Sequence, residues 1–97
     1  MPDFSSIRNI MNVDKKLTGL ELARAIRFSI AAEYEAVQIY EQIIENIDDK
    51  EIIIVIKDII EEEKVHAGQF LEVLFRIDPE EQKKYDEGSR ENRKIRQ

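Results

Sequence analysis

Apolar residues recur at alternating steps of three and four along two long segments of this chain. That spacing places them on one face of a helix, and it predicts two amphipathic helices whose apolar faces pack together. Apart from one tyrosine, the only ionisable groups on these faces are two Glu and one His. We call the two rows the seam: Ile26, Ile30, Glu33, Val37, Tyr40, Ile44 and Ile47, then Ile56, Ile59, Glu63, His66, Phe70, Val73 and Ile77.

Capping residues set the expected limits of both helices. Thr18 followed three residues later by Glu21 forms a capping box, so the first helix is expected to run from about Gly19 to Ile47. Asp48-Asp49 then breaks the apolar pattern and supplies an N-cap for a second helix over Lys50–Arg76. Because the break is short, the two helices are predicted to form an antiparallel hairpin.

A short third helix is predicted after the hairpin. Asp78 suits the N-cap and Pro79 the first helical position, whereas Gly88 is a typical residue just past a helix end. The polar and mostly basic segment 89–97 is therefore predicted to be a disordered tail or a linker. The chain divides into an N-terminal arm (1–17), an all-α helical domain (18–88) and this tail.

Each long helix carries a second apolar stripe beside the seam. A hairpin alone would leave these stripes in water, and exposed apolar patches of this size normally mark interfaces. The sequence therefore predicts a twofold dimer of hairpins that forms one four-helix bundle. The second stripe consists of Phe28, Ala32, Ile39 and Ile43 in the first helix, and Ile53, Ile60, Leu71 and Leu74 in the second.

Glu33, Glu63 and His66 are predicted to stand at one height in the hairpin. Each Glu lies about 15 residues from the turn, which at roughly 1.5 Å per residue is on the order of 22 Å. His66 lies one helical turn from Glu63 on the same face. A buried, unpaired carboxylate is costly, and the seam has no Lys to neutralise these two. A metal ion would compensate them directly.

A dimer axis near these residues would gather four carboxylates and two imidazoles. That set matches the ligands of ferritin-like di-iron bundles, in which two helices give one Glu each and two give Glu-x-x-His. We therefore expect Glu33 and Glu63 to bind iron, one of them as a bridge, and His66 to be the terminal nitrogen ligand. The structural alternative is a hydrogen-bonded core His with half-exposed Glu residues, since Glu-x-x-His also arises by chance in Glu-rich helices.

Three further residues are candidates for supporting roles. Tyr40 lies seven residues after Glu33 on the same face, as an aromatic core residue or as a hydrogen-bond partner of a ligating carboxylate. Glu35 and Glu62 lie off the seam. They are expected to be solvated surface residues or to lead iron ions toward the site.

Composition narrows the functional classes. The chain has 97 residues and a net charge of −6, which argues against nucleic-acid binding because phosphates require a basic face. It has no Cys, so disulfides, thiolate metal sites and Cys nucleophiles are excluded. No apolar run is long enough for a membrane span, and no secretory signal is visible. A cytoplasmic protein with no membrane partner is expected.

Two segments resemble the encapsulated ferritins, short members of the ferritin-like superfamily. They are residues 33–40 (EYEAVQIY) and residues 62–67 (EEKVHA), and the resemblance extends over about residues 20–80. It implies a ferroxidase centre at a dimer interface, with Glu33, Glu63 and His66 as ligands and Tyr40 beside them. It also implies ring-like decamers, pentamers of dimers, inside encapsulin shells that store the mineral.

The sequence departs from that family at several points. Many relatives have a Glu and a Trp at the positions of Ala32 and Ile39, where they form an outer site that attracts metal, so here only Glu35 remains of it. No encapsulin-targeting peptide is recognisable after Gly88. Some relatives are fused to the shell protein, and Gln97 would then be a truncation point within a linker.

Three functions remain open from the sequence. The first is a ferroxidase that oxidises Fe(II) with O2 at a di-iron centre and feeds iron storage in an encapsulin compartment. The second is a rubrerythrin-like di-iron or dimanganese protein that reduces peroxide. The third is a non-catalytic, oligomeric helical cargo or scaffold protein whose seam charges only set the helix register.

Overall fold

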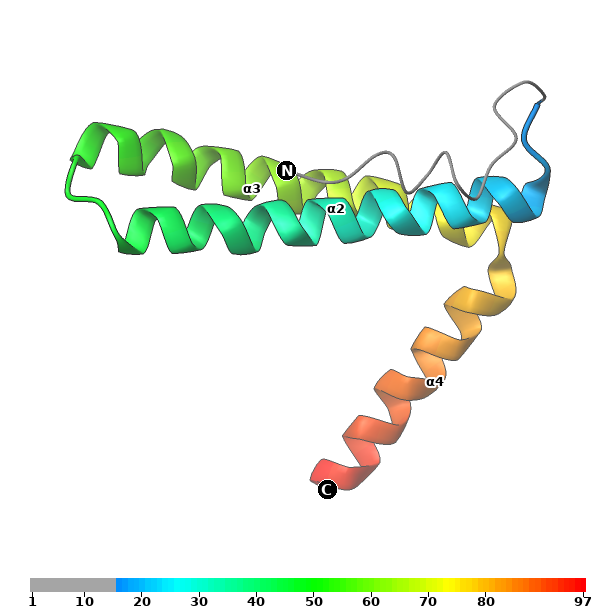
Figure 1. Cartoon of the computed structure of the whole chain (residues 1–97). Coiled ribbons are helices and arrows are strands. Elements are labelled where there is room, and N and C mark those ends of the chain that lie inside the picture. Colours follow the sequence, from blue (N-terminus) through cyan, green and yellow to red (C-terminus); the bar gives the residue numbers. More distant parts are fainter. Residues whose placement is uncertain (1–15) are drawn as a thin grey trace.

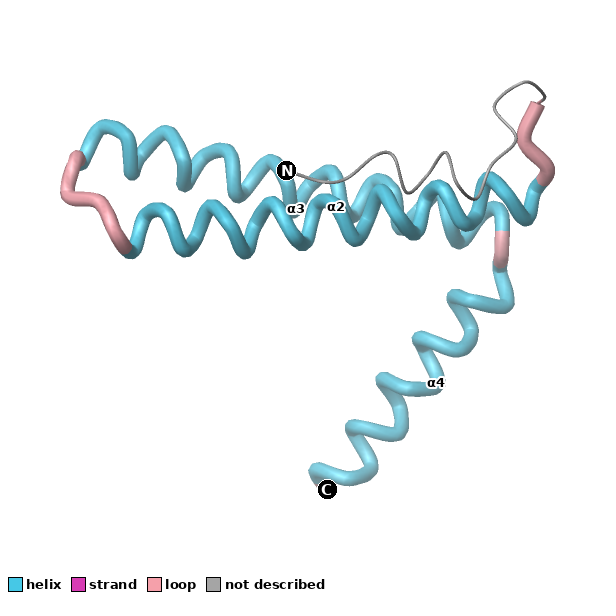
Figure 2. Tube along the Cα trace, in the orientation of Figure 1, coloured by secondary structure: helices cyan, strands magenta, loops and turns pink. Residues whose placement is uncertain are grey.

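The computed structural model describes residues 16–97, and these residues form three helices without a strand. Helices α2 (Gly19–Glu45) and α3 (Lys50–Ile77) lie side by side as an antiparallel hairpin, and α4 (Pro79–Arg96) leaves it at a steep angle (Figure 1). The short connections at the two ends of α3 are seen in Figure 2. The predicted arm at 1–17 falls almost entirely outside the described residues, because only 16 and 17 are included.

The predicted helix starts are confirmed. The Thr18 hydroxyl accepts a hydrogen bond from the Glu21 N–H at 3.1 Å, and the Glu21 carboxylate accepts one from the Thr18 N–H at 3.0 Å. Asp49 accepts hydrogen bonds from the first N–H groups of α3, at 3.0 and 3.2 Å. Asp78 does the same for α4, accepting from the Glu81 N–H at 3.2 Å. These side chains satisfy N–H groups that have no partner within the helix.

The end of the third helix was predicted wrongly. Gly88 does not stop α4, which continues to Arg96, and no glycine of the described chain has a positive φ. Before Gly88, Lys83–Glu80 and Lys84–Glu87 form pairs three residues apart, at 3.0 and 3.4 Å, and such pairs stabilise helices modestly. Basic residues in its last turn also suit the negative end of the helix dipole.

The fully buried core of the hairpin contains fewer residues than the seam, and most of them lie beside it. Its fully buried residues are Ala23 and Ile30 on α2, and Ile60, Ala67 and Leu74 on α3. They recur every seven residues, the repeat of helices that supercoil around each other. Ile60 and Leu74 had been assigned to the second stripe, as residues facing a partner, and this assignment is wrong. Helical periodicity gives the apolar arc but not which of two adjoining stripes faces the other helix.

The single chain leaves much of its apolar surface exposed. Phe28 and Ile43 of the second stripe are 40% and 39% exposed, and Ile52 and Val55 beside the seam of α3 are 48% and 58% exposed. The radius of gyration is 16.9 Å, whereas a compact domain of this size has about 12 Å. None of α2–α4 is both long and apolar enough to cross a membrane.

Candidate metal centre

The hairpin brings Glu33, Glu63 and His66 together, as the sequence predicts. Their ligand atoms all lie within 4.8 Å of one another. His66 Nδ1 is 3.8 Å from a Glu33 oxygen and 3.9 Å from a Glu63 oxygen. We call these three residues the Glu33–Glu63–His66 group. It is built by the antiparallel pairing of α2 with α3 and by the one-turn spacing of Glu63 and His66 on α3.

The carboxylates of this group are largely buried, whereas the imidazole is not. The Glu33 and Glu63 side chains are 16% and 21% exposed, and His66 is 48% exposed. Glu33 Oε2 is buried and has no hydrogen-bond partner, and it is the only such side-chain atom among residues 16–97. An acceptor in this state costs free energy that the hairpin does not recover internally.

The geometry fits a cation better than it fits internal hydrogen bonds. Separations of 3.8 and 3.9 Å between the imidazole and the carboxylates are too long for hydrogen bonds. Atoms that bind one first-row metal ion at about 2.1 Å lie at most about 4.2 Å apart, so these two pairs are within range. Two carboxylates and an imidazole, with no thiolate, are suitable ligands for iron or manganese.

The other three predicted residues lie outside this group. Tyr40 is half-buried on α2, and within residues 16–97 it makes no hydrogen bond to Glu33, Glu63 or His66. Glu35 and Glu62 are exposed, and neither belongs to the cluster of potential ligand atoms. The role of Tyr40 and the recruitment of iron by Glu35 and Glu62 therefore remain predictions.

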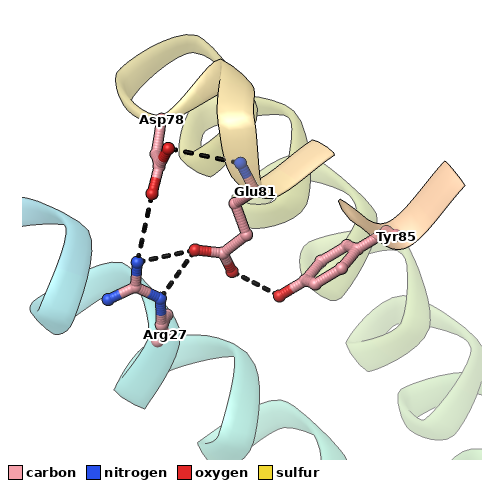
Figure 3. Close-up of polar contacts among 4 residues, drawn as sticks. All are labelled: Arg27, Asp78, Glu81 and Tyr85. Carbon is pink, nitrogen blue, oxygen red and sulfur yellow. Dashed lines mark hydrogen bonds and ion pairs between the residues drawn. The ribbon is translucent and has the colours of Figure 1, made fainter. Parts of the chain in front are cut away.

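A second polar cluster, which sequence reasoning missed, joins α4 to the hairpin. Arg27 on α2 donates from Nε and Nη2 to one Glu81 oxygen at 2.9 and 2.6 Å, and its Nη2 lies 3.5 Å from Asp78. Tyr85 donates a hydrogen bond to the other Glu81 oxygen, as Figure 3 shows. We call these four residues the α4 joint. The acids of the third helix were visible in the sequence, but nothing there indicates that they face Arg27.

Hydrogen bonding within the α4 joint shifts its ionisation. The Arg27 guanidinium, which donates to Glu81, lowers the pKa of that carboxyl, and the Tyr85 hydroxyl lowers it further. The Glu81 carboxylate in turn raises the pKa of Tyr85, because losing the proton would remove the hydrogen bond. The Tyr85 ring also packs edge-on against Phe75 of α3, with 5.5 Å between the ring centroids. The joint thus holds the first turns of α4 through both polar and apolar contacts.

The chain is similar to known proteins over most of its described length. A sequence model of the EncFtn-like family matches residues 7–88. The structure matches a crystal structure of the encapsulated ferritin domain from Pyrococcus furiosus with a TM-score of 0.83 and 32% identity, covering 90% of this chain and 89% of that one. The fold is therefore ferritin-like and all-α, as predicted.

Two curated proteins also match. One is the ferritin-like-encapsulin shell fusion protein of Pyrococcus furiosus, 36% identical over 72 residues, which are 74% of this chain and 21% of that protein. The other is the encapsulin nanocompartment cargo protein EncC of Myxococcus xanthus, 38% identical over 69 residues, which are 71% of this chain and 53% of that protein. The matched region thus spans about half, or less, of each relative.

Proposed function

This chain belongs to the EncFtn-like family, and from that premise we propose that it is a ferroxidase that oxidises Fe(II) to Fe(III) with O2. The observation that carries the proposal is the Glu33–Glu63–His66 group, in which a buried Glu33 oxygen has no hydrogen-bond partner among residues 16–97. Iron is the substrate here. The negative charge and unsatisfied acceptor of the group favour the binding of a divalent cation.

Three ligands of one chain make half of a di-iron site. A second hairpin, related by a twofold axis near His66, would bring the same three residues and so complete four carboxylates and two imidazoles. Two features support this arrangement: the His66 side chain is 48% exposed, and apolar residues of α3 on the same side, such as Val55, are exposed as well. The proposed dimer would cover these residues and close the site.

The paired site would suit oxygen chemistry. Carboxylates can bridge two iron ions and balance their charge, so Glu33 or Glu63 is assigned as the bridge and His66 as the terminal nitrogen ligand. Two Fe(II) ions held side by side can give one electron each to O2, which with two protons leaves as hydrogen peroxide. Tyr40 is assigned to orient a ligating carboxylate, and Glu35 and Glu62 to attract incoming iron.

The partners follow from the relatives. One matched protein is a fusion to an encapsulin shell and another is an encapsulin cargo protein. We infer that this chain works inside an encapsulin nanocompartment in the cytoplasm, as a homodimer that assembles into a decamer, a pentamer of dimers. The shell would store the mineral, because a ring of such small bundles has no enclosed cavity of its own.

Oxygen uptake on addition of Fe(II) tests the proposal. The unaltered protein should oxidise iron far faster than buffer, Glu63→Ala should abolish the fast phase, and Glu72→Ala is a matched control, since Glu72 is an exposed carboxylate on the same helix. If Glu63→Ala oxidises iron at the unaltered rate, the site assignment fails. Faster oxidation with peroxide than with O2 would favour the rubrerythrin-like function, and the absence of any metal-dependent oxidation would leave the scaffold function.

A further inference from the structure

We propose that Ser29 is a positioning residue of the metal site. Its hydroxyl accepts a hydrogen bond from His66 Nε2 and so holds the imidazole with Nδ1 toward the two carboxylates. The inference rests on the metal site proposed above and adds a residue to it. A His that binds a metal through one ring nitrogen almost always donates its other N–H to an acceptor, which fixes the tautomer and the ring orientation. The question is which group serves His66 in this way.

The His66 imidazole has a donor to place. Its Nδ1 is the nitrogen that faces the carboxylates, at 3.8 and 3.9 Å, so Nε2 keeps the proton when Nδ1 binds a cation. These two separations exceed the range of hydrogen bonds, and within residues 16–97 His66 takes part in no other polar contact. A neutral acceptor near Nε2 would fix the orientation of the ring.

Helix register places Ser29 at the level of His66. Ser29 is as many residues from the last residue of α2, Glu45, as His66 is from the first residue of α3, Lys50. The two helices leave one turn in antiparallel directions with the same rise per residue, so both residues lie equally far from that turn (Figure 1). The same count holds within one residue for the two carboxylates, which the structure does bring together.

Ser29 also lies on the face of α2 that carries the site. It precedes Glu33 by four residues, about one helical turn, and so shares its face. On α3, His66 follows Glu63 by three residues. Because the helices are antiparallel, both steps lead away from the turn on the same side of the hairpin. Ser29 is half-buried there, and it is the only Ser or Thr in α2 and α3.

The Ser29 hydroxyl is arranged as an acceptor. It donates its proton to the Ala25 carbonyl within α2, at 3.0 Å, so its oxygen keeps its lone pairs and has no second proton to give. That oxygen can receive the Nε2 proton of His66, directly or through one water. It cannot at the same time donate to a carboxylate of the site, so its role is limited to the imidazole.

The alternative is that Ser29 serves only its own helix. A Ser that bonds to the carbonyl four residues earlier slightly destabilises a helix, and Ala has the highest helix propensity. Ser29→Ala should therefore preserve or raise the thermal stability of the metal-free protein under both interpretations. Only our proposal predicts that the same substitution weakens metal binding. A loss of affinity in a variant that is no less stable cannot be a folding defect.

The affinity for Zn(II), which O2 cannot oxidise, tests the role of the hydroxyl. Ser29→Ala should lower this affinity by about tenfold or more, and Ser29→Thr, which keeps the hydroxyl, should restore it. Gln69→Ala is the matched control, because Gln69 is an exposed, neutral polar residue about one turn from His66 on α3. Equal affinities in Ser29→Ala and in the unaltered protein overturn the proposal.

Nuclear magnetic resonance reads the hydrogen bond itself. His66 is the only His in the chain, so histidine labelled with nitrogen-15 gives the signals of one imidazole. With Zn(II) bound, the Nε2 proton should exchange at least about tenfold faster with water in Ser29→Ala than in the unaltered protein or in Ser29→Thr. Equal protection in Ser29→Ala, or binding of Zn(II) through Nε2, overturns the proposal. Imidazole signals that do not respond to Zn(II) in the unaltered protein would instead refute the metal site itself, so the two failures are distinguishable.

Discussion

The Glu33–Glu63–His66 group within the hairpin and the α4 joint at its end each contain two carboxylates, yet they differ in what neutralises these carboxylates. In the joint, Arg27 lies 2.6 Å from Glu81 and its Nη2 also reaches Asp78. In the other group the only potentially positive neighbour among residues 16–97 is His66, at 3.8 and 3.9 Å, and within that range a Glu33 oxygen has no hydrogen-bond partner. Within the part of the chain that the structure describes, Arg27 neutralises acids of the joint, whereas no Lys or Arg pairs with the carboxylates of the Glu33–Glu63–His66 group.

The difference separates a structural role from a binding role. A carboxylate with its own guanidinium is satisfied, and a cation added there would have to displace Arg27. A carboxylate pair without a cation has unfavourable free energy in the metal-free chain and gains most when a cation arrives. The comparison therefore supports the proposed metal binding at the Glu33–Glu63–His66 group, and it gives the joint the role of attaching α4 to the hairpin.

The largest expected effect comes from comparing one substitution at each site in the same assay of Fe(II) oxidation. His66→Ala removes the nitrogen ligand and should lower the rate of Fe(II) oxidation by at least about 100-fold, with helix content nearly intact by circular dichroism. Arg27→Ala should leave the oxidation rate of the assembled protein close to the unaltered value. Comparable losses in both variants would contradict the division of roles.

Glu33→Gln should affect stability in opposite directions with and without metal. Removing the charge relieves an uncompensated, largely buried carboxylate, so the metal-free protein should become more stable by about 1 kcal/mol. The same change should remove the stabilisation that added metal gives to the unaltered protein. Thermal unfolding with and without Fe(II) under anaerobic conditions measures both, and Glu35→Gln, an exposed neighbour, is the control.

The helix starts and the meeting of Glu33, Glu63 and His66 could be predicted from the sequence, because the first depend on neighbouring residues and the second on regular helix geometry. Capping by Thr18, Asp49 and Asp78 depends on neighbouring residues. The meeting of Glu33 with Glu63 depends only on helix rise and on the position of the turn. The prediction required no knowledge of how the side chains pack.

The remaining features depend on tertiary contacts. Ile60 and Leu74 were misassigned because the small rotation of α3 about its axis is set by packing across the hairpin. The end of α4 was misjudged because Gly88 lies between two stabilising regions of that helix, and a single Gly costs only about 1 kcal/mol. The Arg27–Glu81 contact joins residues 54 apart in the sequence, and its existence depends on the direction in which α4 leaves the hairpin.

Arg27→Ala tests the joint itself. The substitution leaves Glu81 without its cation and should destabilise the attachment of α4 by about 1 kcal/mol, the value typical of a partly exposed ion pair. Faster hydrogen exchange in the first turns of α4, with unchanged exchange in α2 and α3, is the expected result. Arg24→Ala, an exposed Arg one turn earlier on α2, should not alter this exchange.

The pH dependence of the same exchange provides a control. Arg27 lowers the pKa of Glu81 below its ordinary 4.5, so the folded state holds the proton less tightly than the unfolded state. The stabilisation is then fully present above about pH 4.5 and is lost as the pH falls through the folded-state pKa. This acid-dependent loosening of α4 should disappear in Arg27→Ala. If it persists there, another carboxyl is responsible.

Tyr85→Phe should give the smallest effect, because it removes one hydrogen bond to Glu81 and retains the edge contact with Phe75. The expected loss in the stability of the joint is less than about 1 kcal/mol.

The unaltered protein should also show a tyrosine that titrates above the ordinary pKa of 10.0, because Glu81 accepts the hydrogen bond of its neutral form. The stability that the Tyr85–Glu81 hydrogen bond gives the folded state is present below pH 10 and is lost as the pH rises through the raised pKa of Tyr85. Ultraviolet titration should therefore show this high-pH component in Tyr34→Phe but not in Tyr85→Phe. If Tyr85→Phe retains it, the hydroxyl does not bond to Glu81, and the joint rests on Arg27 and the aromatic contact alone.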